Sequence, residues 1–209
     1  MFPDLFRDDV FTLETARLFL RWPKSMDAAQ LADIIGDPGV SRETATFPHP
    51  FTLHHAEERV LKGRTLNLSG KGLSLVLVQR RDPQRVVGLV GVSTGLSEDP
   101  GELSLGYLLA LPLWGQGLIT EAVQGLIDAT YLYSAASGIV ASVRVTNPAS
   151  RRVLEHCGFQ YAGSGMSARP AWGDSVSVDH YRLSRRLWAS LKGWRAPLPT
   201  ERPEFRESA

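Results

Sequence analysis

The chain has 209 residues, of which 43% are hydrophobic, and a formal net charge of +1. These values predict one globular domain with short extensions. So small a net charge argues against nucleic acid as the main partner, because domains that bind it are usually strongly basic. No apolar run is long enough to span a bilayer, so we expect no membrane partner. The single cysteine excludes an internal disulfide framework, which predicts a cytoplasmic protein, and the histidines lack metal-ligand spacing, so we expect no metal.

Hydrophobic periodicity predicts an α/β fold of the α+β type, with a mixed, mostly antiparallel sheet and helices on both faces. The strands are expected over residues 15–22, 73–79, 86–93, 102–109, 139–145, 159–164 and 175–183. The helices are expected over residues 25–35, 52–63, 117–131 and 148–157, the first two capped by Ser25 and Thr52. We expect the domain to cover residues 11–184, and an extension over 185–209 to begin as a helix and end in disorder.

A glycine-rich turn, Trp114-Gly115-Gln116-Gly117, joins the strand over 102–109 to the following helix. Glycines let the backbone approach a ligand closely, and the first N–H groups of a helix have no helical partner, so such a turn can bind an anion. A P-loop requires a lysine after its last glycine, but Leu118 follows Gly117. A dinucleotide fingerprint requires a small residue where this chain has Thr120. The alternative is that the glycines serve only the turn.

A second segment contains Asn147-Pro148-Ala149-Ser150 and ends in Gly158-Phe159. Together with the glycine turn and the opening run from Leu13 to Arg21, it resembles the GNAT superfamily of acyl-CoA-dependent N-acetyltransferases. Within that superfamily the motifs are most similar to the RimJ/RimL branch of ribosomal-protein N-terminal acetyltransferases. The resemblance covers about residues 11–184, and it rests on motifs that occur in the order typical of the family.

The resemblance implies acetyl-CoA as the co-substrate, bound where the sheet splays between its fourth and fifth strands, 102–109 and 139–145. Pro112 fits this implication, because proline cannot donate to a sheet ladder and pairing should end there. Main-chain atoms of Leu109, Ala110 and Leu111 are then expected to hold the pantetheine arm. The pyrophosphate is expected on the amides of Trp114, Gly115, Gln116, Gly117, Leu118 and Ile119. The indole of Trp114 is expected to pack the loop rather than stack on adenine.

The later helix supplies the other implied cofactor contacts. Asn147 precedes Pro148 and is a good helix cap, and its short side chain could also reach a ligand amide. Arg151 could reach a phosphate, with a solvated side chain as the alternative. Many relatives carry a tyrosine as general acid where this chain has Leu154, and the resemblance implies that Ser150 replaces it. The alternative for Ser150 is a purely structural role in the first turn of the helix.

The general base is less well defined by the sequence. Relatives often carry a glutamate at the position of Ser104, and Glu102 lies on the same face of the strand, two residues earlier. We therefore predict Glu102 as a base that acts through water, with an exposed structural glutamate as the alternative. An α-amine has a pKa of about 7.7–8.0 and a lysine about 10.4, so an α-amine requires less help from a base.

The amine acceptor is expected to bind between residues 42–51 and 165–174. The leading prediction is an acetyl-CoA-dependent N-acetyltransferase that acts by direct attack on a peptide N-terminal α-amine or a small-molecule amine. Two alternatives stay open: a catalytically weak CoA-binding regulatory or scaffold module, and an acyltransferase with a larger donor such as succinyl-CoA. The extension from Arg185 is expected to dock on the domain or on a second subunit, which leaves a homodimer open.

Overall fold

The fold is taken from a computed structural model, which describes residues 2–7, 9–44, 47–94, 99–169 and 172–195. They form an eight-stranded sheet in the order β1-β2-β3-β4-β5-β6-β8-β7. Neighbouring strands pair antiparallel, except that β5 and β6 pair parallel. The predicted mixed, mostly antiparallel sheet is therefore confirmed. The strands are β1 (Thr12–Glu14), β2 (Leu18–Arg21), β3 (Gly72–Gln79), β4 (Asp82–Ser93), β5 (Glu102–Leu109), β6 (Gly138–Arg144), β7 (Gln160–Arg169) and β8 (Asp174–Ser184).

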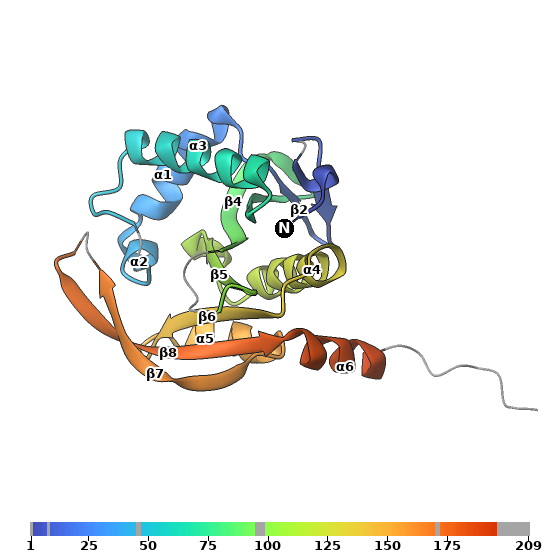
Figure 1. Cartoon of the computed structure of the whole chain (residues 1–209). Helices are drawn as coiled ribbons and strands as arrows, with labels where there is room; N and C mark the ends of the chain where they lie inside the picture. Colours follow the sequence, from blue (N-terminus) through green and yellow to red (C-terminus); the bar gives the residue numbers. More distant parts are fainter. Residues whose placement is uncertain (1, 8, 45–46, 95–98, 170–171, 196–209) are drawn as a thin grey trace, which may run out of the picture.

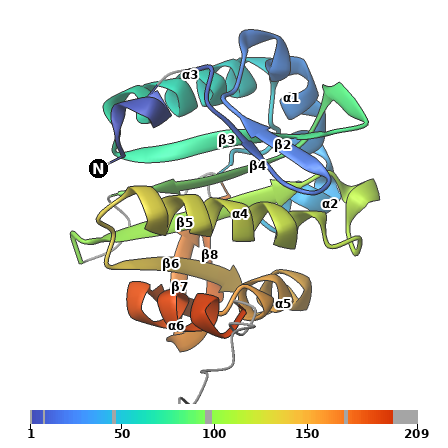
Figure 2. The same cartoon turned by 90° about the vertical axis from the view of Figure 1, so that its right-hand side faces the viewer.

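Helices cover both faces of the sheet (Figures 1 and 2). The pair α1 and α3 packs on one face, over β3 and β4, and α4 packs on the other, against β4 and β5. Each face has its own hydrophobic core, because side chains alternate along every strand. The helices are α1 (Ala28–Gly36), α2 (Pro38–Ser41), α3 (Leu53–Ser69), α4 (Leu118–Tyr133), α5 (Pro148–His156) and α6 (Arg185–Arg195). The short 3-10 turns are η1 (Asp4–Arg7), η2 (Ser25–Asp27) and η3 (Leu111–Leu113).

The parallel strands β5 and β6 pair only over their first residues. The paired residues are Glu102 with Gly138, Leu103 with Ile139, and Ser104 with Val140. Beyond Ser104 and Val140, β5 continues to Leu109 and β6 continues to Arg144, but the two strands no longer pair with each other. The sheet therefore opens between these strands, as predicted for the fourth and fifth strands of the domain. We call this gap the β5–β6 opening.

The structure corrects the predicted start of the sheet and the end of α3. Residues 15–22 do not form one strand; Thr15 lies in the turn of a β1–β2 hairpin, and its hydroxyl accepts from the Leu18 N–H at 3.1 Å. Gly63 does not end α3, which continues to Ser69 and ends at Gly70 with φ of 65°. Gly63 instead allows close packing, because a Cβ there would lie 2.9 Å from Ser74 Oγ. Thr52 caps α3 as predicted, accepting a hydrogen bond from the His55 N–H.

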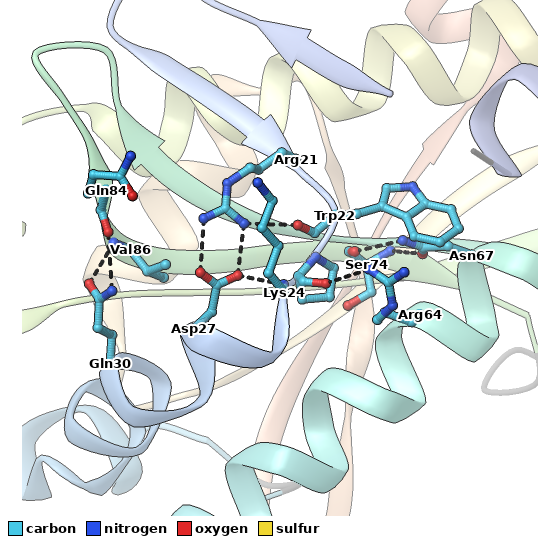
Figure 3. A network of polar contacts seen from close by, with 11 residues as sticks. Arg21, Trp22, Lys24, Asp27, Gln30, Arg64, Asn67, Ser74, Gln84 and Val86 are labelled. Carbon is cyan, nitrogen blue, oxygen red and sulfur yellow. Dashed lines mark hydrogen bonds and ion pairs between the residues drawn. The ribbon is translucent and has the colours of Figure 1, made fainter. Parts of the chain in front are cut away.

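A buried polar network fixes the first helices to the sheet (Figure 3). Asp27 is only 1% exposed, and its carboxylate accepts two hydrogen bonds from the Arg21 guanidinium, at 2.8 and 2.9 Å, and one from the Lys24 N–H. In the same network, the Asn67 side chain on α3 accepts from the N–H of Ser74 on β3 and donates to its carbonyl. Because these buried groups are paired, the network joins β2 and β3 to the helices without leaving an uncompensated charge at Asp27.

The C-terminal helix α6 docks on its own chain. The indole N–H of Trp188 donates to Asp128 on α4 at 2.8 Å, and Lys192 forms an ion pair with the same carboxylate. Arg185 donates to the backbone carbonyls of Tyr131, Ser134 and Ala136 at the end of α4. Docking on the domain is therefore observed, and the homodimer stays a prediction. The expected disorder concerns residues 196–209, which lie outside the described residues. In the part of the chain that the structure describes, no helix is both long and apolar enough to cross a bilayer.

We expect Asp27→Ala to lower the free energy of unfolding by about 3 kcal/mol, because it leaves a buried guanidinium without its counter-charge. Urea unfolding followed by circular dichroism measures the change. Glu58→Ala is the control, because Glu58 pairs with Lys62 on the exposed surface of α3 and its removal should leave stability nearly unchanged. Equal losses in the two variants would contradict the structural role assigned to Asp27.

Candidate active site

The glycine turn leads directly into α4. Gly115 and Gly117 have φ of 74° and 73°, and Gly117 is the N-cap of the helix. Such left-handed positions favour glycine because they carry a steric cost for other residues. Leu118 is buried in the core and anchors the helix, whereas residues 114–117 are exposed. The exposed N–H groups and the positive end of the helix dipole make this turn suited to an anion.

An ion pair from the β1–β2 hairpin holds the glycine turn in place. Glu121, in the first turn of α4, accepts from Arg17 Nε at 2.6 Å, from the Arg17 N–H at 2.7 Å and from the Thr15 hydroxyl at 2.6 Å. The Arg17 guanidinium also donates to the Gln116 carbonyl inside the turn at 2.9 Å. Burial alone would raise the pKa of Glu121, but the hydrogen bonds from Thr15 and Arg17 outweigh it and lower the pKa. The carboxylate is therefore ionised at neutral pH and keeps Arg17 against the turn.

The main chain at the end of β5 is only partly available to a ligand. The N–H of Ala110 donates to Val87 on β4 at 2.8 Å, and its carbonyl accepts from Leu113. Because successive residues of a strand direct their N–H groups to opposite edges, the N–H of Leu109 then faces the β5–β6 opening. The predicted pantetheine contact at Ala110 is thus corrected, since its polar groups are used within the fold. The Leu111 N–H lies on the exposed 3-10 turn η3, and the Leu111 carbonyl accepts a hydrogen bond from the Trp114 N–H.

The side chains of Trp114 and Gln116 both donate hydrogen bonds to backbone carbonyls. The indole N–H of Trp114 donates to the Leu109 carbonyl at 2.8 Å, and the ring is 39% exposed. This geometry agrees with the predicted packing role of Trp114. Gln116 is exposed as expected, and its side chain donates to the Pro112 carbonyl at 3.2 Å. Ile119 is half-buried, and its side chain packs against the core.

Two hydroxyl groups meet beside the β5–β6 opening. Asn147 caps α5 as predicted, and its side chain accepts from the Ser150 N–H at 2.9 Å. The Ser150 hydroxyl lies 2.8 Å from the hydroxyl of Tyr107, which belongs to the part of β5 that has left β6. Burial raises the pKa of Tyr107, so this hydroxyl stays protonated far above neutral pH. A neutral phenol therefore lies beside the Ser150 hydroxyl, and it also donates to the Ser150 carbonyl at 3.1 Å.

Two predicted site residues, Arg151 and Glu102, form ion pairs with residues of β8 instead of facing the proposed site. Arg151 forms an ion pair with Asp179 on β8 at 2.6 Å, so its guanidinium is directed to the sheet and not to the glycine turn. Glu102 is 7% exposed and forms an ion pair with Arg182 on β8 at the paired end of β5 and β6. Tyr107, which contacts Ser150, lies five residues farther along β5. The structure therefore does not bring Glu102 together with Ser150, and the glutamate fits a structural ion pair better than a base.

The two predicted acceptor segments lie against each other. Arg144, at the end of β6, forms an ion pair with Glu43 at 3.6 Å, and His49 stacks on Trp172 with ring centroids 4.9 Å apart. The tip of the β7–β8 ribbon curls toward α2, which places both segments on the same side of the opening (Figure 1). Residues 45–46 and 170–171 of these segments lie outside the described residues. Among the described residues there is no cluster of histidine, cysteine and carboxylate side chains suited to a metal ion.

Sequence reasoning missed Tyr107, Arg17 and Glu121. Each belongs to a segment that the sequence singles out, since Arg17 lies in the opening run, Glu121 follows the glycine turn, and Tyr107 follows Gly106. Their roles depend on contacts between residues far apart in the chain, such as Arg17 with Glu121. An isolated tyrosine or arginine in the sequence gives no sign of such a contact.

Comparison with known proteins agrees with this arrangement. Residues 17–160 match the family described as the acetyltransferase (GNAT) domain. An uncharacterized N-acetyltransferase, p20, of Bacillus licheniformis is 29% identical over 179 residues, which cover 85% of this chain and 98% of that protein. The chain belongs to the GNAT acetyltransferase family.

Solved structures share the fold. The ribosomal-protein-S5-alanine acetyltransferase of Vibrio fischeri superimposes with a TM-score of 0.73 and 21% identity, over 85% of this chain and 98% of that one. RimL, a ribosomal L7/L12 α-N-protein acetyltransferase solved with coenzyme A, gives a TM-score of 0.71 and 18% identity, over 83% and 98% of the two chains. The predicted likeness to RimJ/RimL-type structures is therefore confirmed at the level of the fold.

We expect Glu121→Gln to loosen the glycine turn, because the neutral amide loses the charge that holds Arg17. Hydrogen exchange followed by mass spectrometry should show faster exchange in the peptide that contains residues 114–118, with unchanged exchange in β3. Glu58→Gln on the exposed surface of α3 is the control. Unchanged exchange in the turn would mean that the Arg17–Glu121 pair does not hold it.

Proposed function

We propose that this protein is an acetyl-CoA-dependent N-acetyltransferase that transfers the acetyl group directly to a primary amine. The observation that carries the proposal is the hydroxyl pair of Ser150 and Tyr107 beside the β5–β6 opening. The glycine turn lies at the start of α4, which follows β5 directly, so one extended molecule could contact both features. The family relationship supports an acetyltransferase, and the choice of a nitrogen acceptor is part of the proposal.

The backbone supports coenzyme A as the donor. We assign the pyrophosphate to the N–H groups of residues 115–119, next to the contact of Arg17 with Gln116 and Glu121; the predicted Trp114 amide is not included, because it donates to the Leu111 carbonyl. We assign the pantetheine arm to the open edge of β5, where Leu109 and Leu111 present N–H groups. An extended ligand can bind such an edge as an added strand. The Leu109 N–H is also placed to stabilise the oxyanion that develops on the thioester oxygen.

The acid step follows from the hydroxyl pair. When the amine attacks, the carbon–sulfur bond breaks and the thiolate needs a proton, although with a thiol pKa of about 8.5 it is only a weak base. The Ser150 hydroxyl gives its proton to the sulfur and recovers one from the attacking nitrogen, which must lose its surplus proton. We infer that Tyr107, which stays protonated, positions the serine hydroxyl. Asn147 contributes by fixing the first turn of α5, on which Ser150 lies.

We propose an α-amine at a peptide or protein N-terminus as the acceptor, with a small-molecule amine as the alternative. Structural relatives are named for acetylation of ribosomal proteins, one of them at an alanine. An α-amine has a pKa of about 7.7–8.0, so a useful fraction is already neutral at physiological pH. Such an acceptor suits a site whose predicted carboxylate base, Glu102, is engaged with Arg182.

One structural observation favours a second candidate. Because Glu102 is engaged in an ion pair, a CoA-binding scaffold with little catalytic activity is the competing function. The test is calorimetric titration with acetyl-CoA and succinyl-CoA, followed by a thiol-release assay with peptides that begin with alanine or serine and with small amines. Binding with acetyl transfer supports the proposal, binding without transfer supports the scaffold, and succinyl transfer indicates the larger donor. If no CoA thioester binds, the proposed function is wrong.

We expect Gly117→Val to abolish measurable acetyl-CoA binding, because a β-branched residue is strained at φ of 73° and covers the amides of the turn. Gly70→Val is the matched control, since Gly70 has φ of 65° at the end of α3, away from the turn. Both variants should lose stability, but only Gly117→Val should lose affinity in calorimetry. Retained affinity in Gly117→Val would remove the turn from the cofactor site.

We expect Ser150→Ala to lower kcat by about tenfold or more without a change in acetyl-CoA affinity, because a general acid acts in the transition state. Tyr107→Phe should lower kcat in the same direction by a smaller factor, since the serine hydroxyl remains. Ser69→Ala, at the end of α3, is the control and should behave as wild type. An unchanged kcat in Ser150→Ala would exclude Ser150 from proton transfer.

A further inference from the structure

A second pair of polar side chains lies on the other face of the sheet. His180 on β8 and Ser142 on β6 are direct partners in the antiparallel pairing, and the Ser142 hydroxyl lies 2.9 Å from His180 Nδ1. Both residues are exposed. Their neighbours Ala141 and Tyr181 belong to the core beneath α4 and α5, so alternation puts Ser142 and His180 on the opposite face. They therefore face the side of the acceptor segments, and Ser150 lies on the other side.

Ser142 lies at the edge of the β5–β6 opening. The last paired residues are Ser104 and Val140, and Ser142 is the next residue of β6 on the same face as Val140. Across the opening, Gly106 on β5 belongs to the same face, and a Cβ placed there would meet nothing within 4 Å. The sheet thus leaves space beside Ser142 on the acceptor side. A thioester held in the opening would have Ser150 on one face and Ser142 on the other.

The surroundings of His180 keep its ring toward β6. A Cβ on Gly165 of β7 would lie 2.8 Å from His180 Nε2, so the missing side chain makes room for the imidazole. Charged residues on the same face include Arg182 and Arg144, which pair with Glu102 and Glu43, and Asp174, which pairs with Arg169. Among these residues, the imidazole therefore does not face an isolated cation.

We propose that His180 accepts a proton from the acceptor ammonium through the Ser142 hydroxyl. His180 thereby takes the role of base that the sequence predicted for Glu102. This inference rests on the proposed function. The ammonium gives one proton to Ser142, which passes its own to His180 Nδ1, and the neutral nitrogen forms a bond to the carbonyl carbon. The carbon–sulfur bond breaks, and the second surplus proton of the nitrogen passes through Ser150 to the sulfur. The imidazolium then releases its proton to solvent, so the reaction frees one proton overall.

The test compares two acceptors that differ in their need for a base. One is a peptide with an N-terminal alanine or serine, and the other is the same peptide extended by an aminooxyacetyl group, whose nitrogen is neutral at pH 7. The variants are His180→Gln, His180→Ala and Ser142→Ala. His54→Ala, on the exposed surface of α3, is the control. Calorimetry with acetyl-CoA is run on every variant to show that the fold and the donor site are intact.

We expect the His180 variants to lower kcat/KM at pH 7 by about 100-fold for the α-amine peptide, which is typical of a lost general base. Ser142→Ala should cause a smaller loss, because a water molecule can replace its hydroxyl. With the aminooxy peptide every variant should stay within a few-fold of wild type, a result that a purely structural role would not give. Equal losses with both acceptors, or no loss in His180→Gln, would overturn the inference and leave the proposed function standing. If wild type acetylates neither peptide nor any amine, both the inference and the proposed function fail.

Discussion

The interrupted pairing of β5 with β6 is the constraint on which the rest of the site depends. A sheet normally satisfies its backbone groups through neighbouring strands, and a buried N–H without a partner is costly. Here the pairing stops after Ser104 and Val140, and the remaining β5 residues present one edge to the opening. The indole of Trp114 satisfies the Leu109 carbonyl, while the Leu109 N–H faces the opening. The break in the ladder thereby exposes a strand edge inside a sheet that is otherwise continuous, and the proposed cofactor site uses this edge.

The surrounding elements are arranged so that this break does not destabilise the fold. On one side, Arg17 and Glu121 connect the first hairpin to the glycine turn, so the turn is held by the start of the sheet. On the other side, α5 is capped by Asn147 and presents Ser150 to Tyr107. The two faces of the opening differ in chemistry, because hydroxyl groups lie on the α5 face and a histidine–serine pair lies on the acceptor face. In the proposed reaction, the thioester lies between these two faces, and the amine reaches its carbonyl carbon from the acceptor face.

Much of the fold follows from local patterns in the sequence, and much of the site does not. Thr52, Asn147 and the glycine turn were located correctly, since caps and left-handed glycines have local signatures. The predicted end of α3 at Gly63 was wrong, because the sequence does not distinguish a glycine that allows close packing from a glycine that ends a helix. Glu102 and Arg151 were misjudged for a related reason. Their partners, Arg182 and Asp179, lie on β8, far away in the chain, and nothing local reveals those ion pairs.

The contact of Arg185 with the end of α4 has a consequence for where the folded unit stops. The last carbonyls of a helix lack helical partners, and here one guanidinium satisfies carbonyls of Tyr131, Ser134 and Ala136. Trp188 and Lys192 add bonds to Asp128 on the same helix. A truncation after Ser184 would expose those carbonyls and uncover one flank of α4, the helix whose first turn holds the glycine loop. The segment 185–195 thus belongs to the minimal autonomous module, and any fusion or shortened version of the enzyme should retain it.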